Sequence, residues 1–318
     1  AQNRVFYFTG TAPALEMIPA DGSLNFDDLD TARKMSDEIF GRMVSMMPAV
    51  KGVSSRDLSI PGPKGAPDIT VRVYTPEAET GKRPAMLWIH GGGYLLGDLT
   101  ADDYTMRSMC VNTGCVMVST NYRLAPENPF PAPVEDCYAS LKWMVNNAES
   151  LGIDKTRVAI GGGSAGGGLA AGLAIMTRDR GEIALSFQLL IYPMIDDRNI
   201  TPSSHAITDL RTWDREKNIF AWKAYLGDSI KDGIVSPYAA ASRAKDLSGL
   251  PPAYIAVGEL DLFLDEDIEY AQRLLQAGVP TELHVYPGAT HGFDSIISAS
   301  VVKRFSAERD NAVKRALK

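Results

Sequence analysis

The chain contains 318 residues with a formal net charge of −7; 45% of its residues are hydrophobic and 22% are charged. These fractions are ordinary for a folded protein and exclude an intrinsically disordered chain. The acidic balance, without any run of Lys or Arg, argues against nucleic acid as a partner. Three Cys are too few for a disulfide framework, and Cys110 and Cys115 lack the spacing of a zinc site. We therefore expect free thiols, no bound metal and a reducing compartment.

One stretch is apolar enough to raise the question of a membrane span. Residues 158–177 contain no charged side chain, but seven of these twenty residues are Gly, each of which weakens a helix by ~1 kcal/mol. Residues 1–10 lack the basic patch and apolar core of a signal peptide. The sequence therefore predicts a soluble, cytoplasmic protein without a membrane span.

An amphipathic helix is predicted over residues 25–47, where apolar side chains recur every three or four positions. From about residue 54, short β-rich runs alternate with longer helical runs. Ile69, Val71 and Val73 alternate with polar residues, which predicts a half-exposed antiparallel strand. Continuous apolar runs predict buried parallel strands at 85–89, 115–118, 158–160, 187–191 and 254–257. Helices are expected at 134–149, 165–178 and 265–277, followed by a last strand at 281–286 and a helix ending at Lys318.

This alternation predicts the α/β fold class, with a mostly parallel central sheet and helices on both of its faces. Reactive loops are then expected at the carboxyl ends of the strands. Residues 25–47 and 196–233 fall outside the alternation, and the second segment holds Trp213 and Phe220 among polar residues. Both segments either pack against the main domain or form a lid over the strand ends.

The predicted strand at 158–160 runs into the segment 162–166, which reads Gly-Gly-Ser-Ala-Gly and is followed by a predicted helix. This is the G-x-S-x-G motif in its required strand–turn–helix context. The sharp turn would expose the hydroxyl of Ser164 beside the unpaired N–H groups of the helix start. We therefore predict Ser164 as a nucleophile.

The same stretch also satisfies the dinucleotide-binding pattern G-x-G-x-x-G through Gly161, Gly163 and Gly166. Such a site needs an acidic residue about 20 positions later, at the end of the next strand. Asp179 and Glu182 precede the next apolar run instead of following it. The dinucleotide hypothesis is therefore weaker than the nucleophile hypothesis.

A second glycine-rich segment follows the predicted strand at 85–89 and reads His90-Gly-Gly-Gly. Together with a G-x-S-x-G turn, this segment predicts backbone N–H groups that face the oxyanion of a tetrahedral intermediate. The candidate oxyanion donors are Gly91, Gly92 and Ala165. For His90 itself we expect a structural hydrogen bond.

The chain has four His, so the search for a general base is short. His291 lies in a loop after the last predicted strand, where a base could reach Ser164. Asp261 follows the predicted strand at 254–257 and is the candidate acid that would orient this His. Glu259 is the second choice, and Asp265 is expected to cap the following helix. The remaining His are interpreted as a surface residue and a strand residue; they are His205 and His284.

Four motifs together resemble the bacterial hormone-sensitive-lipase-like carboxylesterases, which are α/β-hydrolases, and among them most closely the heroin esterase branch. The motifs are the segments 90–93, 122–131 and 291–293 and the Ser164 turn. The resemblance runs from about residue 50 to the C-terminus. It implies that Ser164, Asp261 and His291 form a catalytic triad, and it implies the same oxyanion donors. It also implies an α/β-hydrolase catalytic domain over 51–318, no cofactor, and a helical cap. The cap would combine an N-terminal segment, 1–50, with an insert at about 196–233.

Two positions depart from that family's pattern. Gly163 precedes Ser164 where the family usually has Asp, and Leu262 follows Asp261 where the family usually has Pro. Neither departure removes a reacting group, but Gly163 removes an acidic side chain beside the nucleophile.

The expected activity is hydrolysis of carboxylic esters through an acyl-enzyme intermediate. Met43 and Trp213 are expected to line an apolar pocket for short to medium acyl groups of a small-molecule substrate. A lactonase or an amidase would use the same residues, and a non-catalytic ligand-binding receptor would share the fold. Apolar side chains of the C-terminal helix either pack within the chain or join a homodimer; they are Val302, Phe305, Val313 and Leu317.

Overall fold

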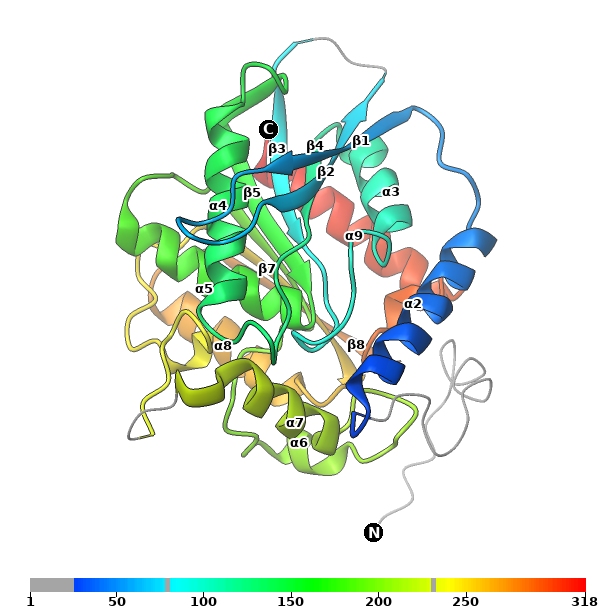
Figure 1. The fold of residues 1–318 in the computed structure, drawn as a ribbon, viewed down its shortest axis with the longest axis vertical. Coiled ribbons are helices and arrows are strands. Elements are labelled where there is room, and N and C mark those ends of the chain that lie inside the picture. The colour runs from blue at the N-terminus through cyan, green and yellow to red at the C-terminus, as the bar shows by residue number, and fades with distance from the viewer. Residues whose placement is uncertain (1–25, 78–80, 230–232) are drawn as a thin grey trace.

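One sheet of eight strands forms the centre of the computed structural model, which describes residues 26–77, 81–229 and 233–318 (Figure 1). The strands lie in the order β1-β2-β4-β3-β5-β6-β7-β8. Their bounds are β1 Val53–Ile60, β2 Ile69–Pro76, β3 Arg83–Ile89, β4 Val116–Thr120, β5 Ile153–Gly163, β6 Phe187–Ile191, β7 Ala253–Leu260 and β8 Thr281–Thr290. Strand β2 pairs antiparallel with both β1 and β4, and the other neighbouring strands are parallel. The predicted α/β class and mostly parallel sheet are confirmed.

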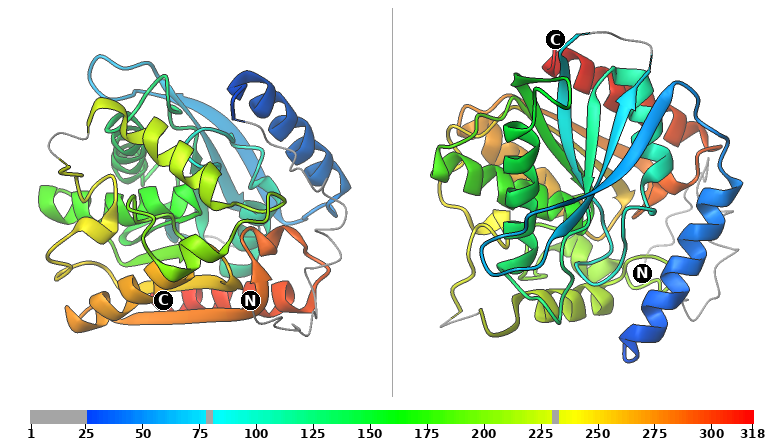
Figure 2. Two further views of the ribbon diagram at one scale, coloured as in Figure 1. Left: turned by 90° about the horizontal axis from the view of Figure 1, so that it is seen from below. Right: turned by 45° about the horizontal axis from the view of Figure 1, so that its top comes forward.

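Helices cover both faces of this sheet (Figure 2). Their bounds are α2 Leu29–Met46, α3 Asp103–Thr113, α4 Ala132–Asn146, α5 Ala165–Arg180, α6 Pro202–Ala206, α7 Arg215–Leu226, α8 Leu264–Gln276 and α9 Ser300–Ala316. Side chains of α4, α5 and α8 join one hydrophobic core, and those of α3 and α9 join a second core. Consecutive residues of β3 alternate between them, since Leu87 belongs to the first core and Trp88 to the second. Apolar side chains at the C-terminus pack within the chain, in the second core; they are Val302, Phe305 and Val313 of α9 and Leu317 directly after it.

Helix α5 follows β5 directly and is buried along most of its length. Glycines in its first turn let it approach the sheet closely, since a Cβ at Gly166 would lie 2.0 Å from the carbonyl oxygen of Ile89. The uncharged stretch at 158–177 therefore comprises the buried end of β5, the turn at Ser164 and most of the buried helix α5. Among the helices of the described residues, none is long and apolar enough to cross a bilayer.

Helix α2 runs along the outside of the molecule (Figure 2) and is held by a polar contact. The Arg33 guanidinium donates to the carbonyl oxygens of Leu95 (2.9 Å) and Ala125 (3.0 Å). It also forms a bidentate ion pair with the Glu127 carboxylate (2.7 and 2.8 Å). The predicted helix over 25–47 is confirmed, but most of its apolar stripe is not buried. The exposed members of that stripe are Met35, Ile39 and Met46.

The two segments outside the strand–helix alternation meet each other. The insert at 196–233 contains α6 and α7, which lie at the same end of the molecule as the start of α2 (Figure 1). The ring of Phe26 lies 5.9 Å from the ring of Trp213 and 5.5 Å from that of Phe220, measured between centroids. The part of the N-terminal segment before residue 26 lies outside the described residues.

Candidate active site

Ser164 occupies the sharp turn between β5 and α5. Its backbone has φ 56° and ψ −122°, a strained conformation for a residue with a side chain. The turn is held because the Ser164 N–H donates to the carbonyl oxygen of Ile191 (2.9 Å), while its own carbonyl oxygen accepts from the N–H groups of Gly168 (2.9 Å) and Met194 (3.0 Å). The G-x-S-x-G motif thus forms the expected strained turn at the amino end of a helix.

Three predicted site residues, Ser164, His291 and Asp261, are connected by hydrogen bonds. The Nε2 atom of His291 lies 2.9 Å from the Oγ of Ser164, and its Nδ1 lies 2.9 Å from the Oδ2 of Asp261. Asp261 is fully buried, and its other carboxylate oxygen accepts from the N–H of Phe263 at 3.0 Å. The carboxylate makes Nδ1 the protonated nitrogen, which leaves Nε2 as the acceptor for the Ser164 proton. These residues meet because the carboxyl ends of β5, β7 and β8 share one edge of the sheet.

The glycine segment after β3 lies directly against the nucleophile. A Cβ at Gly91 would lie 2.9 Å from the carbonyl oxygen of Gly163 and 3.3 Å from the Cβ of Ser164, so a side chain here would push the two segments apart. Gly92 has φ 111°, a conformation that favours glycine. Of the candidate oxyanion donors, Gly91 contacts the nucleophile turn, Gly92 follows Gly91, and Ala165 is the first residue of α5.

His90 supports this glycine segment. Its Nδ1 lies 2.8 Å from the carbonyl oxygen of Gly91 and donates to it. The imidazole stacks on the ring of Tyr122 at 4.3 Å between centroids, and the Tyr122 hydroxyl donates to the carbonyl oxygen of His90 (2.9 Å). Burial lowers the pKa of His90 to about 4, so its ring is neutral at pH 7. The geometry agrees with the structural hydrogen bond expected for His90.

The other acidic residues near the triad bind backbone groups. Glu259, the second choice for the acid, accepts from the N–H of Gly288 at 3.0 Å. Asp265 does not cap α8 as expected, because the helix begins one residue earlier; its carboxylate accepts from the N–H of Ser203 in α6 at 2.7 Å. Glu266 is buried and accepts from the backbone N–H groups of Ile195 and Asp196, at 3.0 and 3.1 Å. These long-range contacts have no local signature in the sequence.

Trp213 reaches the site from the insert at 196–233. A Cβ at Gly93 would lie 2.2 Å from the Trp213 ring, so the indole covers the glycine segment directly. The indole centroid lies 6.5 Å from that of the His291 ring. The Nε1–H group of Trp213 donates to the Oδ1 of Asn218 at 2.9 Å, which fixes the orientation of the ring. Trp213 therefore lies where a side chain can border a bound substrate.

The N-terminal segment approaches the site through Phe26, which sequence analysis did not single out. Phe26 is 7% exposed and contacts Trp213. Met43 is half-buried and lies about 20 Å along the axis of α2 from the helix start near Phe26. Periodicity identifies which face of a helix is apolar but not which end approaches a site. The role of Met43 as a pocket residue stays a prediction.

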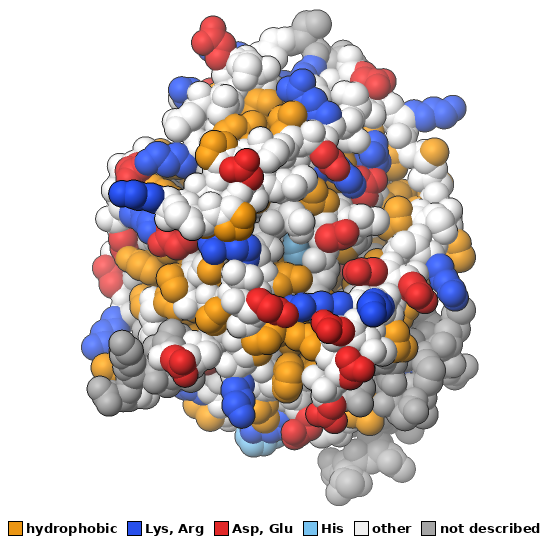
Figure 3. Space-filling model, in the orientation of Figure 1, with side chains coloured by type: hydrophobic (Ala, Val, Ile, Leu, Met, Phe, Trp, Pro, Cys, Tyr) orange, Lys and Arg blue, Asp and Glu red, His pale blue; other side chains and the backbone are white. Residues whose placement is uncertain are grey.

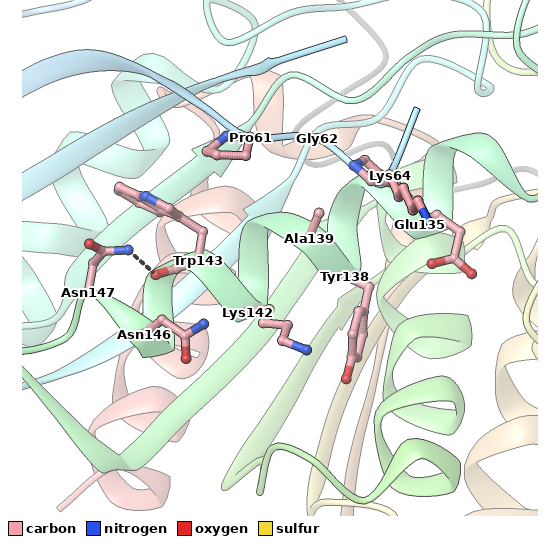
Figure 4. Close-up of a pocket in the computed structure, with 11 residues that line it drawn as sticks. Pro61, Gly62, Lys64, Glu135, Tyr138, Ala139, Lys142, Trp143, Asn146 and Asn147 are labelled. Carbon is pink, nitrogen blue, oxygen red and sulfur yellow. Dashed lines mark hydrogen bonds between the residues drawn. The ribbon is translucent and has the colours of Figure 1, made fainter. Parts of the chain in front are cut away.

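The molecular surface offers other features outside this site. On the face drawn in Figure 3, acidic and basic side chains are interspersed with apolar ones. A groove of about 460 Å³ lies between the loop after β1 and helix α4, bordered by residues that include Pro61, Lys64, Tyr138, Lys142 and Trp143 (Figure 4). Within the described residues, no group of three or more His, Cys, Asp or Glu side chains is placed to hold a metal ion.

Comparison with known proteins agrees with this geometry. Residues 86–295 match a family model described as the alpha/beta hydrolase fold. Carboxylesterase NlhH of Mycobacterium tuberculosis is 39% identical over 263 residues, which cover 80% of this chain and 81% of that protein. The solved structure of a bacterial heroin esterase is 45% identical, with a TM-score of 0.92 and 96% of each chain covered. Esterase LipW from Mycobacterium marinum is 35% identical, with a TM-score of 0.86 over 96% of this chain and 95% of that chain.

The chain belongs to the α/β-hydrolase fold family. The resemblance to hormone-sensitive-lipase-like carboxylesterases is confirmed as well, because these relatives are named as a carboxylesterase, a heroin esterase and an esterase.

Proposed function

We propose that this chain is a carboxylesterase in which Ser164 attacks the acyl carbon of a small-molecule ester. The observation that carries this proposal is the position of His291, which lies 2.9 Å from the Ser164 hydroxyl and 2.9 Å from the Asp261 carboxylate. The N–H groups of Gly91, Gly92 and Ala165 serve as oxyanion donors, and each such donor typically contributes about 3 to 4 kcal/mol to transition-state stabilisation.

The reaction proceeds in two halves. As Ser164 Oγ bonds to the acyl carbon, its proton passes to Nε2 of His291, and the Asp261 carboxylate stabilises the imidazolium. His291 then gives this proton to the departing alcohol oxygen as the ester C–O bond breaks, which leaves an acyl-enzyme. A water molecule next gives a proton to His291 and bonds to the acyl carbon, and the carboxylic acid departs as Ser164 recovers its proton.

The decisive experiment compares the wild-type protein with Ser164→Ala on p-nitrophenyl acetate. We expect hydrolysis by the wild-type protein and its loss in Ser164→Ala, while Ser119→Ala, a substitution of another buried serine, retains activity. A fluorophosphonate should label the wild-type protein and not Ser164→Ala, which separates an enzyme from a non-catalytic receptor. Parallel assays on lactones and anilides separate an esterase from a lactonase or an amidase.

The acyl groups accepted are short to medium in length. This part of the proposal is supported by Trp213, which covers the glycine segment beside Gly93 and is backed by the ring of Phe26. Trp213→Ala should extend the range of p-nitrophenyl esters hydrolysed towards longer chains, and Trp143→Ala, in the groove of Figure 4, should not. An unchanged chain-length profile in Trp213→Ala would show that this indole does not border the acyl group.

We also propose that the protein is cytoplasmic and forms a homodimer. The location is supported by Cys110 and Cys137, two buried residues whose thiols form no disulfide among the described residues, which suits a reducing compartment. The homodimer is supported by β8, which lies at the edge of the sheet and leaves Val285 39% exposed. Light scattering after size-exclusion chromatography tests the oligomeric state.

A further inference from the structure

Tyr192 touches both the base and the turn that follows it. Its ring lies 4.6 Å from the His291 imidazole between centroids, at an interplanar angle of 62°. The Tyr192 hydroxyl donates to the Oδ1 of Asp294 at 2.5 Å, and its ring lies 6.0 Å from that of Phe293. One side chain therefore contacts the imidazole and two of the three residues that follow His291.

Tyr192 is itself held firmly. It follows β6 with φ 35°, a strained value for an aromatic residue. Its N–H donates to the carbonyl oxygen of Ala256 in β7 at 2.6 Å, and its neighbour Ile191 accepts from the N–H of Ser164. Burial and the nearby Asp294 carboxylate raise the pKa of Tyr192, so the hydroxyl keeps its proton and remains a donor.

Gly163 leaves room for this arrangement. A Cβ at this position would lie 3.6 Å from Cε2 and 3.8 Å from the hydroxyl oxygen of Tyr192. These are ordinary contact distances, so a methyl group would fit. An Asp side chain, which is usual at this position in the resembling family, could reach the Tyr192 hydroxyl from here and compete with Asp294 as the acceptor of its hydrogen bond. The departure at Gly163 and the Tyr192–Asp294 hydrogen bond are therefore compatible features of this chain.

We propose that Tyr192 and Asp294 are positioning residues that hold the His291 turn at the correct distance from Ser164. The hydrogen bonds of His291 fix the imidazole relative to its partners, but the backbone that carries it belongs to the loop after β8. The Tyr192–Asp294 bond ties that loop to the end of β6, beside the nucleophile. Because a misplacement of about 1 Å can cost a factor of about 10² in rate, a small drift of the loop lowers turnover. This inference rests on the proposed function and deepens it.

The test measures hydrolysis of p-nitrophenyl acetate by single and double variants. Tyr192→Phe keeps the ring and removes the bond to Asp294, and we expect kcat to fall about tenfold with KM within a factor of about two. Asp294→Ala should give the same loss, while Asp294→Asn should restore most of kcat because its amide oxygen still accepts from Tyr192. The double variant Tyr192→Phe/Asp294→Ala should lose no more than either single variant, because both remove one interaction.

Tyr286→Phe is the matched control. The Tyr286 hydroxyl also donates to a carboxylate, that of Glu308, at 2.5 Å. Its ring packs on Phe293 at 5.3 Å between centroids, a contact that the Phe variant keeps. Among the described residues, Tyr286 has no hydrogen bond or ring contact with His291. It should lower the thermal midpoint about as much as Tyr192→Phe and leave kcat unchanged. Equal kcat in the two Phe variants, or losses that multiply in the double variant, would overturn the positioning role. An inactive wild-type protein or an active Ser164→Ala would instead overturn the proposed esterase function, so the two failures are distinguishable.

Discussion

Gly91→Ala tests whether the glycine segment must lie against the nucleophile. The added Cβ would lie 2.9 Å from the carbonyl oxygen of Gly163 and 3.3 Å from the Cβ of Ser164. Ordinary contact begins near 3.4 Å, so the segment must retreat from that carbonyl by about 0.5 Å. The same shift moves the Gly91 and Gly92 N–H groups away from the oxyanion. Since removing one such donor costs about 10²-fold to 10³-fold in kcat, we expect a loss of about 10²-fold, or about 3 kcal/mol.

The assay follows kcat and KM on p-nitrophenyl acetate, together with the thermal midpoint. Only kcat should change strongly, because the oxyanion forms in the transition state and not in the bound ester. Gly41→Ala is the matched control, since a Cβ at Gly41, within α2, would meet no atom within 4 Å. It should leave kcat unchanged and slightly stabilise the helix. If Gly91→Ala retained full kcat, the reasoning that places oxyanion donors in this segment would be refuted.

Three further predictions follow from other contacts. Asp261→Asn should lower kcat by about 10³-fold to 10⁴-fold, because the imidazole loses the partner that fixes its tautomer and stabilises its charge. Glu259→Gln should keep kcat within a few-fold of wild type. A larger loss of kcat in Glu259→Gln than in Asp261→Asn would identify Glu259 as the acid. Because burial lowers the pKa of His90 to about 4, the stability that its neutral ring provides is present above pH 6.5 and is lost as the pH falls towards 4. The difference in free energy of unfolding between wild type and His90→Phe, measured in urea, should therefore shrink by about 3 kcal/mol from pH 7 to pH 4, and a constant difference would contradict this. Arg33→Ala should speed hydrogen exchange of the α2 amides, while Arg42→Ala, an exposed position on the same helix, should not; equal protection in both variants would show that the Arg33 contacts do not hold α2.

Much of the fold, and the positions of Ser164, Asp261 and His291, could be predicted because the sequence patterns that indicate them are local. Continuous apolar runs identify the parallel strands, and Ser164, Asp261 and His291 each follow such a strand within a few residues. In a parallel sheet the carboxyl ends share one edge, so proximity in space follows from position along each strand. The glycines at 91 and 92 add a second local signal, because their positive φ or close contacts exclude other residues.

The remaining contacts could not be predicted because they join distant residues without a periodic pattern. Arg33 and Glu127 are 94 residues apart, and their pairing decides how α2 is held, while the apolar stripe of that helix stays largely exposed. Tyr192 adopts a positive φ that no sequence signal indicates, because neither a glycine nor a known turn motif marks this position.

Helix α6 has a consequence for the exchange of the insert at 196–233 between related proteins. Ser203 donates its N–H to Asp265 at 2.7 Å and its hydroxyl to the carbonyl oxygen of Leu262 at 2.9 Å, so α6 supports the loop that carries Asp261. The insert at 196–233 is therefore not one interchangeable module. A chimera that replaces the whole insert removes these supports of the acid loop, whereas one that begins after Ala206 and replaces α7 alone keeps them. We therefore expect the end of α6 to separate the segment that tolerates exchange from the segment that supports the Asp261 loop.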